Sequence, residues 1–235
     1  MSSTKSFSAK NPKNLVSLSL SKNAWSSWGR LDARDNEELL KPFTETEVKK
    51  VIFSMKENSA LGPDGFSVSF YKHCWELIKP ELMLMINDFY MGNLGISRLN
   101  YGVITLILKV KNANNVKQFW PICLLNVSFK IFTKLLTDKL THLANKLISG
   151  VQTAFTKGRY ILDDAVMLHE IVHDIKVKKK QGVLFKIDFK NAYDNIKWEF
   201  VEEVLTRKGF DPKVRHWIMS TDRGVKFVLI LTGKW

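Results

Sequence analysis

One aspartate stands where its carboxylate could bind a metal ion. Asp188 lies in the apolar, β-favouring run 183–189, and a helix-like segment begins near Asn195. A carboxylate at a strand end can bind Mg²⁺ through hard oxygen ligands, and the ion can then neutralise charge on a triphosphate during phosphoryl transfer. An aspartate in such a place is more often a helix cap or a turn residue. Its role therefore depends on the rest of the chain.

Two residues that follow Asp188 have types that suit the same site. Ala192 is small and leaves room for a sugar, and the ring of Tyr193 can lie under that sugar. The three side chains together are candidates for a nucleotide site.

Length and composition set the class of protein. The 235 residues, 45% of them hydrophobic, are enough for one large or two small domains with a core. A net charge of +13 favours a polyanionic partner, because each Lys or Arg that meets a phosphate releases condensed counterions. Nucleic acid is the leading candidate, and a merely basic protein is the alternative.

Cysteine spacing and hydropathy indicate the kind of cellular compartment in which the protein works. Cys74 and Cys123 do not form a paired metal-ligand spacing, and the five histidines do not supply a zinc site. No apolar run approaches the length of a membrane span, and the first residues lack the apolar core of a signal peptide. We expect a reduced, intracellular protein with no membrane span and no targeting peptide.

The N-terminal half predicts mostly helices. Residues 1–40 are polar and predict a linker or a partly ordered arm. Thr44 and Glu47 have the spacing of a capping box, which predicts a helix over 45–57. The glycines and the proline of 60–66 predict a tight turn.

Further helices and one strand follow. Pro80 is expected in the first turn of a helix that ends at Gly92. The β-branched content of 101–109 predicts a strand with Lys109 at its end. The basic cluster 176–180 is expected at a solvated hairpin tip, with phosphate binding and nuclear import as alternatives. After Asp194, one helix face carries Trp198, Val201 and Leu205 and is expected to face the core.

Six motifs occur in a recognisable order. They are Ala60–Phe66, Ile104–Lys109, Phe119–Asn126, Lys130–Lys134, Gln152–Ile161 and Lys186–Asp194. In this order they resemble successive blocks of a plant LINE-type, non-LTR retrotransposon reverse transcriptase, over about residues 40–235. The ordered set carries the resemblance, since the Gly-Pro-Asp-Gly turn alone is common.

The resemblance implies an α+β fold, a partial right-hand polymerase that is helix-rich with a small antiparallel sheet. It divides the chain into an arm over 1–40, a fingers-like region over 41–180 and an incomplete palm over 181–235. It also implies an RNA-directed DNA polymerase that works with two Mg²⁺ ions, an RNA template, a DNA primer and deoxynucleoside triphosphates. Nuclear location would follow from the need of such elements to reach chromosomal DNA.

The same resemblance assigns site residues by motif position. Asp188 would be the catalytic, metal-binding carboxylate, Tyr193 would disfavour a ribose 2′-hydroxyl, and Ala192 would keep the pocket floor small. Lys109 would approach the incoming triphosphate, and Arg159 would shape the template and nucleotide region. Lys109 as an exposed loop lysine and Arg159 as a packing or helix-end arginine are the alternatives.

Three residues depart from the family pattern. Trp120 stands where arginine is usual, Leu108 where proline is usual, and Cys123 where serine is common. Trp120 cannot make the bidentate phosphate contact of a guanidinium, so we expect weaker nucleotide binding. The cysteine is a smaller change.

The family's second catalytic motif, a pair of aspartates on a hairpin turn, is not found in these residues. Asp194 is better suited to capping the helix that follows it than to replacing that pair. We therefore expect a truncated reverse transcriptase that is inactive alone, with the runs 183–189 and 225–231 short of strand partners. A non-catalytic, basic nucleic-acid-binding remnant and a product that folds poorly are the two other hypotheses.

Overall fold

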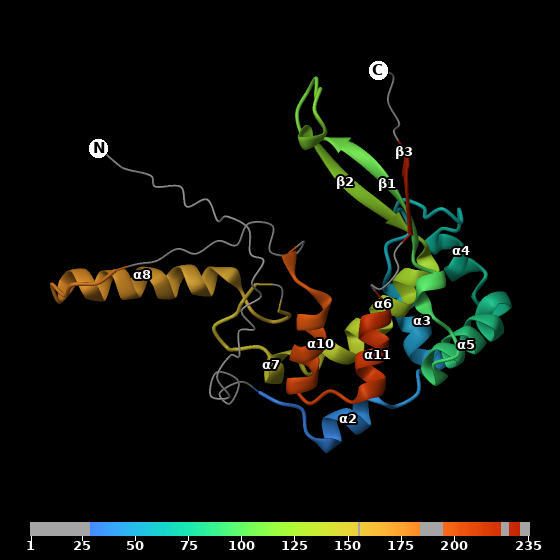
Figure 1. The fold of residues 1–235 in the computed structure, drawn as a ribbon, viewed down its shortest axis with the longest axis horizontal. Coiled ribbons are helices and arrows are strands. Elements are labelled where there is room, and N and C mark those ends of the chain that lie inside the picture. The colour runs from blue at the N-terminus through green and yellow to red at the C-terminus, as the bar shows by residue number, and fades with distance from the viewer. Residues whose placement is uncertain (1–28, 155, 184–194, 222–225, 231–235) are drawn as a thin grey trace.

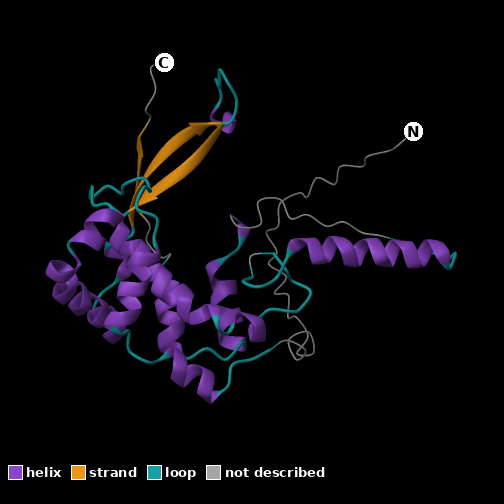
Figure 2. Cartoon of the chain, turned by 180° about the vertical axis from the view of Figure 1, so that it is seen from behind, coloured by secondary structure: helices purple, strands orange, loops and turns teal. Residues whose placement is uncertain are grey.

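The computed structural model describes residues 29–154, 156–183, 195–221 and 226–230. Most of the helices pack into one body, and two features project from it in different directions, a β-hairpin and the long helix α8 (Figures 1 and 2). The helices are α2 Ala33–Leu39, α3 Glu45–Ser54, α4 Val68–His73, α5 Trp75–Met91, α6 Val127–Thr141, α7 Ala144–Leu147, α8 Ile161–Val177, α10 Trp198–Arg207 and α11 Pro212–Ser220. The strands are β1 Tyr101–Leu108, β2 Phe119–Leu125 and β3 Lys226–Ile230, with short 3-10 turns at Ile96–Arg98 and Val116–Gln118.

Side-chain caps fix where the early helices begin. The Thr44 hydroxyl accepts from the Glu47 amide at 3.2 Å, and the Glu47 carboxylate accepts from the Thr44 amide at 2.7 Å, which confirms the predicted capping box of α3. Asp32 and Asp35 form a second box at the start of α2. Helix α3 ends at Ser54, three residues before the predicted end at 57. The predicted turn is confirmed, since the Gly65 amide donates to the Gly62 carbonyl at 3.1 Å.

The hydrophobic core lies between α3, α5, α6 and α11. Trp217 of α11 is 1% exposed, and its ring packs within 6 Å of the centroids of Phe43, Phe89 and Tyr90. Phe89 in turn packs edge-on against Phe132 of α6, at 5.3 Å between centroids. The core therefore joins residues from both ends of the described chain.

The described part of the sheet has the strand order β2-β1-β3. Strands β1 and β2 are antiparallel, with Leu108 opposite Phe119 and Gly102 opposite Leu125. The prediction of a helix-rich fold with a small antiparallel sheet is thus confirmed. Strand β3 pairs with β1 in parallel, so the expectation that the run 225–231 lacks a strand partner was wrong.

Two other local predictions were wrong. Helix α5 begins at Trp75, so Pro80 lies inside it rather than in its first turn; proline lacks one amide donor there, but its fixed φ is helical. Lys176 lies in the last turn of α8, and Lys178 is its C-cap, so the basic cluster 176–180 ends a helix and is not a hairpin tip. Its cations there stabilise the negative end of the helix dipole.

The end of the segment predicted as an arm packs against the helical body. Leu31 and Leu39 are buried in the core. The buried Lys208 donates from Nζ to the carbonyls of Gly29 at 3.0 Å and Leu147 at 2.8 Å, and burial lowers its pKa. Residues 29–39 are therefore fastened to α7 and to the end of α10.

In α10, Leu205 packs against the core as predicted, but Trp198 at the start of the helix is 39% exposed. Helix α8 exposes most of its side chains. Among the described residues, no helix has both the length and the apolar character needed to cross a membrane.

We expect Trp217→Ala to lower the free energy of unfolding by about 3–5 kcal/mol, because it removes the central ring of the aromatic core and leaves a cavity. Trp120→Ala is the matched control, since the Trp120 side chain is 59% exposed, and its cost should be about 1 kcal/mol or less. Denaturant unfolding followed by circular dichroism measures both. Equal costs for the two variants would contradict this account of the core.

A second prediction concerns acid stability. Lys146 of α7 pairs with Asp32 at 2.9 Å and with Asp35, and its hydrogen bond lowers the pKa of Asp32 to about 2. A carboxylate whose folded pKa is depressed contributes stability above its unfolded pKa, near 3.8, and loses it as pH falls toward 2. Lys146→Met should therefore lower the thermal midpoint at pH 6, and this difference from the wild type should shrink toward zero by pH 2.

Lys56→Met, a change at an exposed lysine elsewhere, controls for the loss of one positive charge. A difference between wild type and Lys146→Met that stays constant from pH 6 to pH 2 would show that the Asp32 pair does not contribute.

Candidate functional site

The hairpin of β1 and β2 presents Lys109 at its outer end. The Lys109 amide donates to the Gln118 carbonyl at 2.8 Å, which continues the antiparallel pairing one residue beyond β1. The connecting loop is closed by its own hydrogen bonds, since the Gln118 side-chain oxygen accepts from the amides of Asn114 at 2.8 Å and Asn115 at 3.1 Å. Lys109 therefore starts from a fixed backbone position.

The ammonium of Lys109 is held against the hairpin itself. Its Nζ lies 4.1 Å from the centroid of the Trp120 ring and donates to the Lys117 carbonyl at 3.2 Å. Both side chains are exposed to solvent. Lys109 is thus an exposed lysine, as the alternative reading held, but one with a defined place for its charge.

Sequence reasoning missed the contact between Lys109 and Trp120. It treated Trp120 only as the loss of an arginine, because it did not predict strand β2. Pro121 lacks the amide donor that a central strand needs, but β2 is an edge strand of the described sheet and tolerates it. The pairing of Ile107 with Trp120 places Trp120 diagonally across from Lys109 on the same face.

Arg159 binds backbone carbonyls of its own segment. Its Nη1 donates to Gln152 at 2.7 Å and to Ser149, and its Nη2 donates to Ile148 at 3.2 Å. The guanidinium therefore ties the connection between α7 and α8 into a compact loop. These contacts agree with the alternative reading of a packing arginine, and a role in nucleotide binding stays a prediction.

The structure does not bring Lys109 and Arg159 together. The hairpin tip and the start of α8 lie on different sides of the body in both views (Figures 1 and 2). The other three predicted site residues, Asp188, Ala192 and Tyr193, lie outside the described residues.

The residues that the structure describes contain no group of three or more His, Cys, Asp or Glu side chains placed to hold a metal ion. Near the start of α8, Asp164 accepts a hydrogen bond from the Thr153 hydroxyl and so fastens the preceding loop. The expected metal ligand, Asp188, is not part of the described structure.

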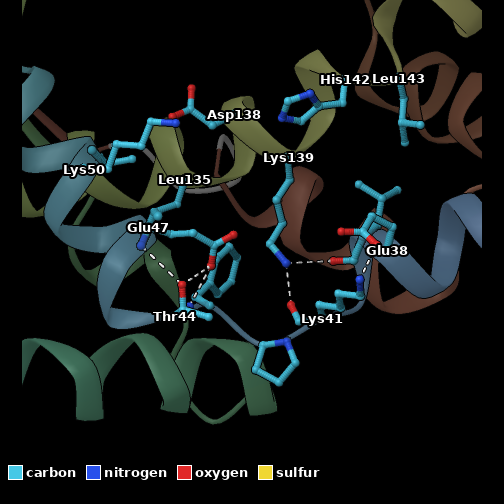
Figure 3. Close-up of a pocket in the computed structure, with 14 residues that line it drawn as sticks. Glu38, Lys41, Thr44, Glu47, Lys50, Leu135, Asp138, Lys139, His142 and Leu143 are labelled. Atoms are coloured by element: carbon cyan, nitrogen blue, oxygen red, sulfur yellow. Dashed lines mark hydrogen bonds and ion pairs between the residues drawn. The ribbon is translucent and has the colours of Figure 1, made fainter.

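A cavity of about 440 Å³ lies between the α2–α3 connection and α6. Figure 3 shows Lys139 of α6 reaching across it to the end of α2. Its ammonium donates to the Leu39 carbonyl at 3.2 Å and to the Lys41 carbonyl, and lies 4.5 Å from the Phe43 ring centroid. Burial lowers the pKa of Lys139. The lysine here fastens α2 to α6, and of the predicted site residues that the structure describes, neither Lys109 nor Arg159 lines this cavity.

The sequence from Lys109 onward decides the family. Residues 109–229, just over half of the chain, match the profile described as reverse transcriptase (RNA-dependent DNA polymerase). The chain belongs to this family. The match begins at the lysine of the hairpin tip and includes all five predicted site residues. Reverse transcriptases generally use divalent metal ions, in keeping with the expected role of Asp188.

Two relatives are proteins of mobile elements. Over 190 residues, 80% of its length, this reverse transcriptase chain is 23% identical to the transposon TX1 uncharacterized 149 kDa protein of Xenopus laevis. Over 202 residues, 85% of its length, it is 24% identical to the retrovirus-related Pol polyprotein from the type-1 retrotransposable element R2 of Nasonia vitripennis. The matches cover 14% and 19% of these relatives, so the chain spans less than a fifth of either.

We expect Arg159→Lys to loosen the loop between α7 and α8, because one ammonium cannot replace a planar fork that reaches three carbonyls. Hydrogen bonds from charged donors contribute about 1.5–3 kcal/mol, so local opening should become at least tenfold more frequent. Limited proteolysis with mass spectrometry should show faster cleavage within residues 148–160. Lys157→Met, at an exposed lysine of the same loop, is the control and should leave the cleavage rate unchanged.

Proposed function

We propose that this chain supplies the fingers region (41–180) and the first part of the palm (181–235) of an RNA-directed DNA polymerase from a non-LTR retroelement, of a lineage similar to the plant LINE-type elements. The continuous family match from residue 109 to residue 229, which spans both the hairpin lysine and the Asp188 motif, carries this proposal. The two relatives from mobile elements support it.

In this proposal each predicted side chain has one role. Asp188 holds Mg²⁺, which when bound neutralises charge on the triphosphate. Lys109 meets the phosphates from the hairpin, and Ala192 and Tyr193 contact the sugar. Arg159 supports the template side through the loop that it ties together.

The proposed partners are an RNA template, a DNA primer and deoxynucleoside triphosphates. The net charge of +13 supports binding to these polyanions. Because the second carboxylate motif of the family does not lie within these 235 residues, we propose that they do not extend a primer by themselves. A nuclear site of action belongs to the same proposal, since chromosomal DNA is the target of such elements.

The second candidate function is nucleic-acid binding without chemistry. It is favoured by the excess of 36 basic over 23 acidic residues, which does not depend on any catalytic group. The two candidates differ in what Asp188 does. A polymerase segment needs this carboxylate for Mg²⁺-dependent nucleotide binding, and a simple basic binder does not.

The test is the affinity of the chain for dTTP, measured by calorimetry with and without Mg²⁺, in the wild type and in Asp188→Asn. We expect Mg²⁺ to strengthen dTTP binding about tenfold or more in the wild type and to have little effect in the variant, because a carboxylate is the hard ligand that the ion needs. Asp138→Asn, an exposed carboxylate of α6, controls for the charge change and should behave as the wild type.

Binding of dTTP that Mg²⁺ does not strengthen in the wild type and that Asp188→Asn leaves unchanged would favour the second candidate. A primer-extension assay on the same samples completes the test, and we expect no extension by the wild type or the variant. Extension by the wild type that is lost in Asp188→Asn would show that these residues are catalytically sufficient.

A further inference from the structure

The strand register of the hairpin places the side chains of Lys109 and Trp120 next to each other. Trp120 pairs with Ile107 across the strands, and the Lys109 amide is bonded to the Gln118 carbonyl, so the two side chains lie diagonally on one face. The ammonium is placed by the ring at 4.1 Å and by the Lys117 carbonyl at 3.2 Å. Two independent contacts therefore define where this charge sits.

These contacts leave the ammonium able to bind an anion. A lysine ammonium has three donors, and one of them is used by the Lys117 carbonyl. The indole face attracts the ammonium through its quadrupole. It offers no lone-pair acceptor, so it does not occupy a second N–H donor of Lys109. Trp120 and Lys109 are both exposed, so the remaining donors can reach a ligand from solvent.

An unrestrained lysine has many rotamers, and binding a phosphate must select one of them. We propose that Trp120 is a positioning residue: its ring holds the Lys109 ammonium in place before the triphosphate of an incoming nucleotide arrives. This inference rests on the proposed function, in which Lys109 meets the phosphates. With an indole at position 120, the hairpin tip lacks the second cation that an arginine would supply. The ring instead orients the ammonium of Lys109.

The hairpin tip is suited to recognise phosphate groups and not a particular base. A single pre-placed ammonium contacts phosphate oxygens and has no donor pattern that distinguishes one base from another. Binding at the hairpin tip should therefore follow the charge of the polyphosphate and be indifferent to the base. Inorganic tripolyphosphate is accordingly a sufficient probe.

The experiment measures tripolyphosphate affinity of the whole chain at one low ionic strength, because exposed charges are screened by salt. The variants are Trp120→Ala, Trp120→Phe, Lys109→Gln and the double variant Trp120→Ala with Lys109→Gln. Ile122→Ala is the matched control, since Ile122 is exposed on the same face of the same strand but pairs with Thr105, farther along the hairpin from Lys109 than Trp120 is.

We expect Trp120→Ala to weaken binding roughly two- to fivefold, which is the range for loss of an exposed cation–π contact. Trp120→Phe should remain within about twofold of the wild type, because it keeps an aromatic face. Ile122→Ala should have no effect. In the Lys109→Gln background, Trp120→Ala should cause no further loss, since the ring then has no cation to hold.

Each other outcome has a distinct meaning. If Trp120→Ala binds as the wild type does, or weakens binding equally with and without Lys109, the positioning role is overturned. If Lys109→Gln leaves the affinity unchanged, the proposed contact of Lys109 with phosphates fails as well. Circular dichroism and the thermal midpoint of every variant identify those that remain folded, and Trp120→Phe decides the question if Trp120→Ala does not fold.

Discussion

The packing of Trp217 against Phe43, Phe89 and Tyr90 is the interaction on which the described structure depends. It brings α11, from the C-terminal part of the chain, into contact with α5 and with the connection before α3, both of which lie more than a hundred residues earlier. Burial of large aromatic rings supplies much of the apolar area that such a body can remove from water. The helical body is therefore one unit, and the projecting hairpin has a solid base.

The base of the hairpin is fixed, and its tip is exposed. Asn100, which is buried just before β1, donates from its side chain to the Thr221 carbonyl at 2.9 Å and so links the first strand to the end of α11. At Gly102 an added Cβ would lie 2.5 Å from the Cys123 sulfur and 3.0 Å from a methyl carbon of Leu125, so these two side chains occupy the space that a larger residue would need. A firm base with a polar, solvent-facing tip suits a side chain that must meet a ligand from solvent.

Local signals predicted the elements that depend on local chemistry. The capping box at Thr44 and Glu47, the turn closed by Gly65 and the strand ending before Lys109 are all in the structure, because each is set by residues within a few positions. Features that depend on distant partners were not predicted. Strand β2 was hidden by Pro121, which only an edge position allows. The run 225–231 was expected as a strand, but its parallel pairing with β1 was not.

The same division applies to the candidate site. Residue types and motif order placed Lys109, Arg159, Asp188, Ala192 and Tyr193 in a nucleotide site. Lys109 contacts an indole across the hairpin, and Arg159 binds carbonyls of its loop. Both contacts depend on the folded structure, so the pattern of residue types in the sequence does not reveal them. Asp188, Ala192 and Tyr193 lie outside the described residues, so their roles stay predictions.

The central claim is that the hairpin tip meets the phosphates of a nucleotide through Lys109. The most direct measurement is nuclear magnetic resonance of the lysine side chains during a titration with dTTP, with the Lys109 signal assigned from Lys109→Arg. The account predicts that the Lys109 signal shifts most and saturates with the binding curve. A Lys109 signal that stays in place while those of other lysines move would contradict it.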